Sequence, residues 1–362
     1  MDRQFLLHAT RLAARHHGRT APNPSVGCVL VREGQVIAAA VTAIGGRPHA
    51  EVQALAGIHA RGATAYVTLE PCAHYGKTPP CAQALIDAGV VRVVYACNDP
   101  DARVDGRGAA MLRAAGVVVE KITLTEAATI HRGFSRRMRH GLPAVTMKLA
   151  TSADGRMSDP SGARWITGAE ARRHGHALRA RHDALLTGIG TVLADDPQLN
   201  LRLPGLSHAF PRIVCDRQLR LPLGSQLVRS AEQQPVWVIT TAEAVEHAAS
   251  HAAELRERGV VIHVLEAPEP TPQHMLKVIG DVGINDLLIE AGPTLSESFL
   301  AAGLVDQLFW YRATHRLEGP QMALAAHLPT LEASGARRQF SLGDDRLSVY
   351  ELASCLPDSS AV

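Results

Sequence analysis

Apolar positions along the chain switch repeatedly between a two-residue and a 3.6-residue period. The first 18 residues place apolar side chains at helical spacing, which predicts an amphipathic helix. Residues 26–33 and 35–41 predict two strands joined by a turn at Glu33-Gly34, and therefore a hairpin. Strands are then predicted at 63–69, 91–97 and 117–120, in alternation with helices at 48–62, 79–89, 106–116 and 125–141. This alternation predicts a sheet covered by helices.

The pattern is interrupted at Gly141-Leu142-Pro143 and then starts again, so we predict two α/β domains, 1–143 and 144–362. In the second domain, residues 203–211 predict a loop and the tail after Leu356 is expected to fray. The predicted strands are 144–151, 182–190, 212–216, 235–240, 260–265, 286–292 and 304–313, and the predicted helices are 169–180, 243–258, 272–280 and 294–302.

Composition narrows the function classes. Of the 362 residues, 46% are hydrophobic and 20% charged, which excludes a disordered or collagen-like chain. Aromatic residues are only 4% and the net charge is +2, so we expect no nucleic-acid partner. The basic cluster Arg136, Arg137 and Arg139 is interpreted as a solvated helix face or a C-terminal turn that complements the helix dipole.

Cysteine usage and the absence of targeting patterns indicate the cellular compartment of the protein. Six cysteines in a chain of this length do not form a disulfide framework. No apolar run approaches the roughly 18 residues that span a membrane, and the N-terminus lacks a signal-peptide core. We therefore expect a cytoplasmic protein with no membrane partner. We also expect a homo-oligomer.

The first half carries a constellation typical of zinc deaminases. His49, Cys72 and Cys81 are ligand types that bind zinc tetrahedrally, and three protein ligands leave a fourth position for water. Zinc lowers the pKa of its bound water towards ~7, which makes hydroxide available. Glu51 lies two residues after His49, where a carboxylate can move a proton from that water to a leaving amine. His-x-Glu followed by Pro-Cys and a second Cys is typical of base deaminases.

Other interpretations of these residues were weighed. A closed structural zinc site in a non-enzymatic binding protein needs a fourth ligand, and His74 is the only nearby candidate, with awkward spacing to Cys72. A nucleic-acid-editing deaminase is disfavoured by the low aromatic content and by eight residues between Cys72 and Cys81, where the editing signature has two.

The second half is less decisive from its residues alone. Residues 188–191 (GIGT) follow a predicted strand, and residues 290–294 (EAGPT) lie between a strand and a helix, where a phosphate is favoured. Neither is the complete Gly-x-Gly-x-x-Gly fingerprint, so ordinary strand-to-helix turns explain them equally well.

Longer motifs connect the whole chain to a known family. The first half contains PNPSVG, PHAEVQAL, TLEPCAHYGKTPPC, GRG at 106–108 and RGFSRRMRHGLP, and the second contains MKLATSADGR, WITGAEARR, GTVLADDPQLNLR, RIVCD and EAGPTL. With these motifs the chain closely resembles the RibD family, the bacterial bifunctional riboflavin-biosynthesis pyrimidine deaminase–reductases. The resemblance implies a cytidine-deaminase-like α/β/α domain followed by a dihydrofolate-reductase-like α/β domain.

For the first half, the resemblance implies hydrolytic loss of the 2-amino group of 2,5-diamino-6-(5-phosphoribosylamino)pyrimidin-4-one. Asn23, His74 and Lys77 would help to hold this substrate, with Lys77 suited to a phosphate. Alternatively, Asn23 is a turn residue and Lys77 is a solvated loop cation.

For the second half, the resemblance implies that NADPH reduces C1′ of the deaminated product to give a ribitylamino group. The substrate would contact Arg179, Leu199, Arg202 and Glu290, where guanidinium suits its 5′-phosphate, with Lys148 and Asp154 as polar members of the pocket. The NADPH site would be lined by Ala150, Trp165, Thr191, Asp195, Gly292, Pro293, Thr294, Leu295, Ser296, Glu297 and Ser298.

Several positions depart from the family pattern. The stretch before His49 is Ala38–Thr42 instead of Gly-x-Gly-x-His, and Asp99-Pro100-Asp101 replaces Asp-Pro-Asn. The metal ligands, Glu51 and the long insert are intact, so we expect deamination to survive. In the second half, Ala163 and Arg217 each stand where serine is common, and Arg217 is either a ligand of the NADPH 2′-phosphate or a surface residue.

Overall fold

The chain forms two compact units in the computed structural model, which describes residues 1–74, 79–101, 105–158, 165–267, 270–317, 330–331, 333 and 335–352. Of the described residues, Met1–Pro143 and the short segment Gly280–Asn285 make up one unit, and Ala144–Ile279 and those between 286 and 352 make up the other. Among the described residues, no helix has the length and apolar character needed to cross a membrane.

The first unit is a five-stranded sheet with the strand order β2-β1-β3-β4-β5. β1 pairs antiparallel with β2 and β3, whereas β3, β4 and β5 run parallel. The strands are β1 (Gly27–Arg32), β2 (Gln35–Val41), β3 (Thr64–Leu69), β4 (Arg92–Cys97) and β5 (Val118–Lys121), and the helices are α1 (Asp2–His16), α2 (Ala50–Leu55), α3 (Cys81–Asp87), α4 (Arg107–Ala114) and α5 (Thr125–His140).

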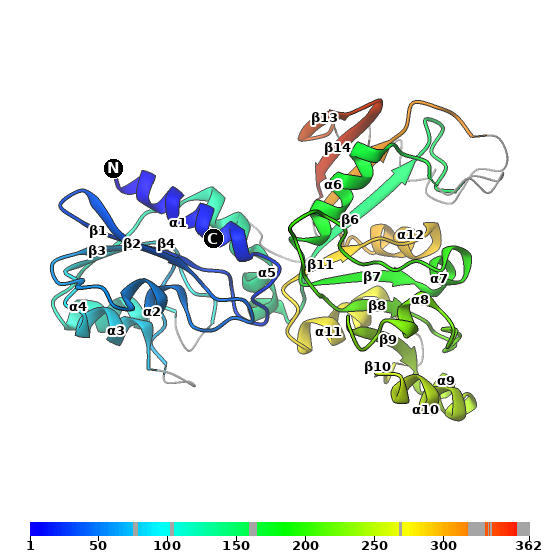
Figure 1. Ribbon diagram of the computed structural model, residues 1–362, viewed down its shortest axis with the longest axis horizontal. Helices are drawn as coiled ribbons and strands as arrows, with labels where there is room; N and C mark the ends of the chain where they lie inside the picture. The colour runs from blue at the N-terminus through cyan, green and yellow to red at the C-terminus, as the bar shows by residue number, and fades with distance from the viewer. Residues whose placement is uncertain are drawn as a thin grey trace. The chain divides into compact units, whose positions relative to one another are not determined.

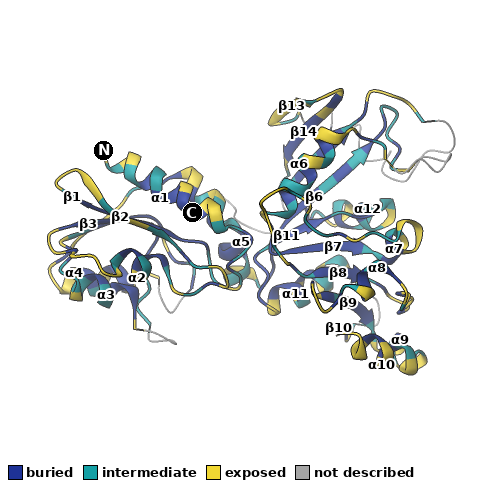
Figure 2. Ribbon diagram, viewed as in Figure 1, coloured by how far each residue is buried: buried dark blue, intermediate teal, exposed yellow. Residues whose placement is uncertain are grey.

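Helices cover both faces of this sheet. α1 and α5 lie on one face and α2, α3 and α4 on the other, which gives the expected α/β/α architecture (Figure 1). The central strands are almost continuously buried (Figure 2), because both of their faces are covered. Aliphatic side chains such as Leu6, Leu30, Leu85 and Leu112 fill the core and are fully buried.

The second unit is a nine-stranded sheet with the order β10-β9-β8-β7-β11-β6-β12-β14-β13. The strands from β10 to β12 in this order are parallel, and an antiparallel β14-β13 hairpin completes one edge. The strands are β6 (Ala144–Thr151), β7 (Ala184–Gly188), β8 (Arg212–Cys215), β9 (Val236–Thr241), β10 (Val260–Leu265), β11 (Asp286–Ile289), β12 (Gln307–Arg312), β13 (Arg338–Leu342) and β14 (Asp345–Glu351). The helices are α6 (Ala169–Arg179), α7 (Ile189–Asp195), α8 (Gln226–Arg229), α9 (Ala242–His247), α10 (Ala249–Glu257), α11 (Pro272–Asp281) and α12 (Pro293–Ala301).

Three local predictions need correction. The helix predicted at 48–62 is only α2, since the chain turns at Gly57 with φ +70°. The helix predicted at 243–258 is divided into α9 and α10. The strands β13 and β14 were not predicted; β13 (RQFSL) is mostly exposed at the sheet edge and lacks a buried apolar repeat.

The interpretation of the basic cluster as a solvated face is wrong for Arg136, which is 8% exposed. α5 packs against α1 and the sheet, and this side chain lies on the packed side. Burial, with a smaller contribution from Arg132, lowers the pKa of Arg136 to about 10. Arg139 is exposed, as predicted.

Candidate active sites

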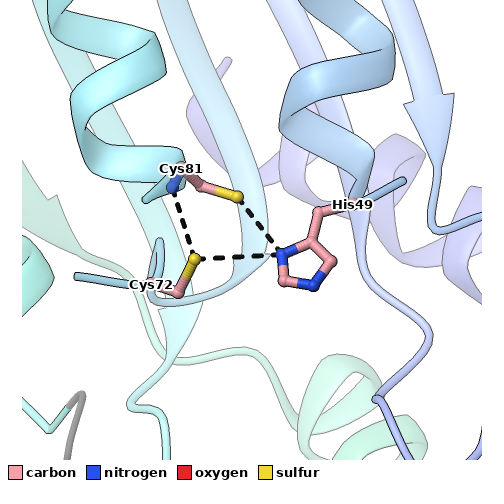
Figure 3. A group of neighbouring side chains, drawn as sticks. All are labelled: His49, Cys72 and Cys81. Atoms are coloured by element: carbon pink, nitrogen blue, oxygen red, sulfur yellow. Dashed lines mark hydrogen bonds between the residues drawn. The ribbon is translucent and has the colours of Figure 1, made fainter. Parts of the chain in front are cut away.

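The predicted metal ligands converge in the first unit. His49 immediately precedes α2, Cys72 follows β3, and Cys81 is the first residue of α3, so three separate elements supply the three side chains. The His49 Nδ1 atom lies 3.3 Å from the Cys81 Sγ and 3.8 Å from the Cys72 Sγ (Figure 3). All three candidate ligand atoms lie within 4.8 Å of one another.

The donor set fits zinc. Hydrogen bonding from the Cys81 side chain, opposed by burial and assisted by His49, lowers the pKa of Cys72 to about 4, and the thiolate is the form that binds metal. The Cys81 backbone N–H also lies 3.3 Å from the Cys72 Sγ. Among the described residues, His74 is not part of the metal-ligand cluster, although it lines a cavity that His49 and Cys72 also line. Two thiols and one imidazole therefore leave a fourth tetrahedral position open, as in catalytic zinc sites.

Glu51 lies beside these ligands in the first turn of α2. Its side chain is 4% exposed and lines the same cavity. Burial raises the pKa of Glu51 to about 7, with His49 opposing the shift and Cys72 adding to it. A carboxyl group that titrates near neutrality is suited to accept and return a proton.

The cavity around this cluster has a volume of about 620 Å³. Predicted substrate residues Asn23 and His74 line it, whereas Lys77 lies outside the described residues. The Asn23 side chain donates to the Gly46 carbonyl at 2.9 Å, which fixes its orientation. The cavity is also lined by Arg47, Phe134, Arg137 and Met138, to which the sequence motifs assign no role in the site. It is lined as well by Thr42, Asp99 and Asp101, which belong to stretches that depart from the family pattern.

Glu70 is a residue whose role the sequence did not reveal. It is 2% exposed, and its two carboxylate oxygens accept hydrogen bonds from the backbone N–H groups of Gly106 and Ala109 at 3.1 and 3.0 Å. A Cβ on Gly108 would lie 1.9 Å from the Pro71 carbonyl oxygen, so α4 packs directly on the segment that precedes Cys72. Glu70 thus joins the start of α4 to the loop that carries Cys72, a candidate metal ligand.

A second cavity, of about 580 Å³, lies in the second unit. Most of the predicted substrate residues and part of the predicted NADPH set line it. They are Lys148, Arg179, Leu199, Arg202 and Glu290 from the first set, and Ala150, Trp165, Thr191, Asp195 and Gly292 from the second.

Glu290 is the anionic centre of this cavity. Its two carboxylate oxygens accept hydrogen bonds from Nε and Nη2 of Arg179 at 2.6 and 3.0 Å, and Lys148 Nζ lies 3.9 Å away. Burial alone would raise the pKa of Glu290, but the charge and hydrogen bonds of Arg179 outweigh it and hold that pKa at about 2. The Arg179 edge that could grip a phosphate in a bidentate manner is therefore occupied by Glu290.

Other predicted residues lie away from this cavity. Asp154 accepts hydrogen bonds from the Ser152 hydroxyl and the Leu317 N–H, which is a turn-forming role. Arg217 is exposed on the loop after β8, and Ala163 lies outside the described residues. Pro293, Thr294, Leu295, Ser296, Glu297 and Ser298 form the start of α12 and, apart from Gly292 before them, do not line the cavity.

Comparison with known proteins assigns the two units. Residues 1–97 match the cytidine and deoxycytidylate deaminase zinc-binding region, and residues 143–315 match the RibD C-terminal domain. Fold and sites thus define a two-domain α/β enzyme in which a zinc deaminase precedes a reductase.

Similarity to relatives extends over nearly the whole chain. The riboflavin biosynthesis protein RibD of Escherichia coli K12 is 40% identical over 95% of this chain and 96% of its own. The structure of Acinetobacter baumannii RibD (form 1) matches with a TM-score of 0.85 and 38% identity, covering 97% of this chain and 99% of that one. The chain belongs to the RibD family of bifunctional riboflavin-biosynthesis enzymes.

A third relative has a more explicit description. The Thermotoga maritima protein is described as a diaminohydroxyphosphoribosylaminopyrimidine deaminase/5-amino-6-(5-phosphoribosylamino)uracil reductase. It matches with a TM-score of 0.82 and 29% identity, covering 97% of this chain and 99% of that one.

Proposed function

We propose that this chain deaminates 2,5-diamino-6-(5-phosphoribosylamino)pyrimidin-4-one and then reduces the product with NADPH to 5-amino-6-(5-phosphoribitylamino)uracil. We assign the first reaction to residues 1–143 and the second to residues 144–362. The observation that carries the proposal is the convergence of His49, Cys72 and Cys81 beside Glu51, which lines the same cavity as His49 and Cys72.

In the deaminase, His49, Cys72 and Cys81 would hold zinc, which lowers the pKa of water and so supplies a nucleophile at neutral pH. Glu51 accepts a proton at its carboxylate and passes it to the amine that leaves as ammonia. Asn23 and His74 contact the pyrimidine from the cavity wall, and Lys77 supplies a charge for the phosphate.

In the reductase, bound NADPH would supply the hydride for C1′ of the substrate, and the ring oxygen that is freed when the ribose opens needs a proton. Lys148 lines the cavity, and burial lowers its pKa, which favours release of a proton. Arg179 orients Glu290, while Arg202, which is exposed on the cavity wall, provides charge for the 5′-phosphate.

NADPH would lie along Ala150, Trp165, Thr191, Asp195 and the start of α12. The Thr191 hydroxyl accepts a hydrogen bond from the Gly292 N–H at 3.1 Å, which links α7 to the turn before α12. Arg217 would bind the NADPH 2′-phosphate. We also propose that the protein forms a homo-oligomer, works in the cytoplasm, and has this phosphorylated pyrimidine, and no nucleic acid or membrane, as its partner.

A coupled assay tests the proposal. Purified zinc-loaded protein is incubated with the diaminopyrimidine ribotide, first without and then with NADPH. Release of ammonia in the first step, followed by NADPH oxidation in the second, is the expected result. Zinc-loaded protein that releases no ammonia from this ribotide would contradict the proposal.

A further inference from the structure

His176 lies in the reductase cavity without a role in the sequence motifs discussed above. It is on α6, three residues before Arg179, so the two side chains share one face of the helix. Together with Arg202 and Glu290 they line the second cavity. The imidazole is therefore placed among the charged groups that would meet a substrate.

One hydrogen bond fixes the tautomer of this imidazole. The backbone N–H of Arg202 donates to His176 Nδ1 at 3.3 Å. Because an amide N–H cannot accept, Nδ1 must be the unprotonated nitrogen, and in the neutral ring the proton is on Nε2. Burial, with help from the charges of Arg179 and Arg202, lowers the pKa of His176 to about 4, so the ring is neutral at pH 7.

The opposite nitrogen is available to a ligand. Among the residues that the structure describes, the bond from Arg202 is the one hydrogen bond made to His176. Because the side chain lines the cavity, Nε2–H is the donor that this tautomer leaves for a ligand bound there. A buried or half-buried donor of this kind gains most from an acceptor brought by the substrate.

Arg202 provides the charge beside this donor. Its guanidinium donates to the side-chain oxygens of Asn200 and Gln198 at 2.9 and 3.4 Å, which are neutral acceptors. Arg179, in contrast, has Nε and Nη2 on Glu290 and Nη1 on the Asn200 carbonyl. Arg202, which is exposed, and His176 lie together on the cavity wall, whereas Arg179 is engaged by Glu290, so an incoming phosphate would meet Arg202 and His176.

We propose that His176 Nε2–H donates a hydrogen bond to a phosphate oxygen of the phosphoribosyl substrate, next to Arg202. The same ring holds the Arg202 backbone through Nδ1, so one imidazole both shapes and completes the phosphate subsite. This inference rests on the proposed reductase function and adds a substrate-binding residue to it.

Two substitutions separate the two nitrogens. His176→Asn keeps an acceptor near the Nδ1 position but loses the distal donor, whereas His176→Gln places an amide N–H near the Nε2 position and loses the proximal acceptor. Each variant and the wild type are assayed for NADPH oxidation with the deaminated ribotide and with its dephosphorylated nucleoside. Fluorescence of Trp165, Trp237 and Trp310, all in the second unit, confirms that each variant is folded.

For His176→Asn, we expect the KM for the ribotide to rise about tenfold or more, the range for losing a hydrogen bond to a charged group. The kcat and the KM for NADPH should stay within about twofold. His176→Gln loses the bond to the Arg202 backbone but keeps the distal donor, so its KM for the ribotide should rise less than that of His176→Asn, by about threefold at most. With the nucleoside, the difference between His176→Asn and the wild type should vanish.

The assignment is overturned if the wild type is active and His176→Asn binds the ribotide normally. It is also overturned if both variants lose ribotide affinity equally, or if the loss persists with the nucleoside. A wild-type enzyme that fails to oxidise NADPH with the ribotide instead overturns the proposed function, and this assignment with it.

Discussion

Glu290 and Arg179 form a largely buried ion pair in the lining of the reductase cavity. Both carboxylate oxygens of Glu290 accept hydrogen bonds from the Arg179 guanidinium. Each side chain is only 12% exposed, so solvent screens the pair weakly. Removing one partner of such a pair leaves an uncompensated buried charge, which is strongly destabilising. The pair therefore links the stability of the unit to the ionisation of its active site.

Acid should weaken the second unit through Glu290. The pKa of this carboxyl is about 2 in the folded protein, below its ordinary value, so its contribution is complete above about pH 5 and is lost as the pH falls towards 2. A shift of this size corresponds to about 3 kcal/mol of unfolding free energy.

The test compares the wild type with Glu290→Gln. Urea unfolding of each protein is monitored by tryptophan fluorescence at pH 7 and at pH 3. At pH 7, Glu290→Gln should have a lower free energy of unfolding than the wild type. At pH 3, the difference in free energy of unfolding between the two proteins should be smaller. If the difference in free energy of unfolding is the same at both pH values, the Glu290 carboxyl is not the cause of the pH dependence of stability.

Removal of zinc should separate the two activities. Dialysis against a chelator, or Cys72→Ser, should abolish ammonia release, because the nucleophile depends on the metal. NADPH oxidation with the deaminated ribotide should persist, because none of the described residues that line the reductase cavity belongs to the metal cluster.

Metal analysis should give one zinc per chain, and Cys97→Ala, which removes a buried thiol outside the cluster, should keep it. Full deaminase activity in a metal-free protein would exclude the zinc mechanism.

Glu70 should act as a positioning residue for the metal site. Glu70→Ala leaves the N–H groups of Gly106 and Ala109 without their carboxylate, at a cost of about 3 kcal/mol. We expect faster hydrogen exchange across α4 and weaker zinc binding in a chelator competition. Glu70→Gln should be intermediate, because an amide accepts through one oxygen only.

Glu126→Ala removes an exposed carboxylate of the same unit and is the control, with an effect within about 0.5 kcal/mol. Unchanged exchange and unchanged zinc affinity in Glu70→Ala would show that the α4 contact does not position Cys72.

Arg217 should discriminate between the nicotinamide cofactors if it binds the 2′-phosphate. Arg217→Ala is then expected to raise the KM for NADPH about tenfold and to leave the KM for NADH unchanged, since NADH has no 2′-phosphate. Arg220, an exposed arginine on the same loop, is the matched control. Equal effects on both cofactors would identify Arg217 as an ordinary surface residue.

The fold was predictable where each element has its own periodic signal. Pro80 before Cys81 and the glycine after α5, Gly141 at φ +70°, mark boundaries that local chain geometry decides. β13 was not predictable, because its stability comes from pairing with β14 and its side chains are mostly exposed. The same holds for Arg136, whose burial depends on packing between separate elements.

The clustering of the candidate metal ligands was predictable because residue type and spacing define them. Residues that act through contacts distant in sequence were not: Glu70 reaches across 36 positions to Gly106, and the role of His176 depends on the backbone of Arg202, 26 positions later. The bidentate grip of Arg179 on Glu290 likewise changes an expected phosphate contact into an orienting one, which only the folded arrangement reveals.

The central claim is that one chain carries two independent chemistries, and Glu51→Gln tests it most directly. Zinc content is measured first, then ammonia release from the diaminopyrimidine ribotide, and finally NADPH oxidation with the deaminated ribotide. We predict bound zinc, an ammonia rate lowered on the order of a thousandfold, and an unchanged reductase rate. A variant that retains zinc and releases ammonia at the wild-type rate, or that loses both activities together, would contradict the account.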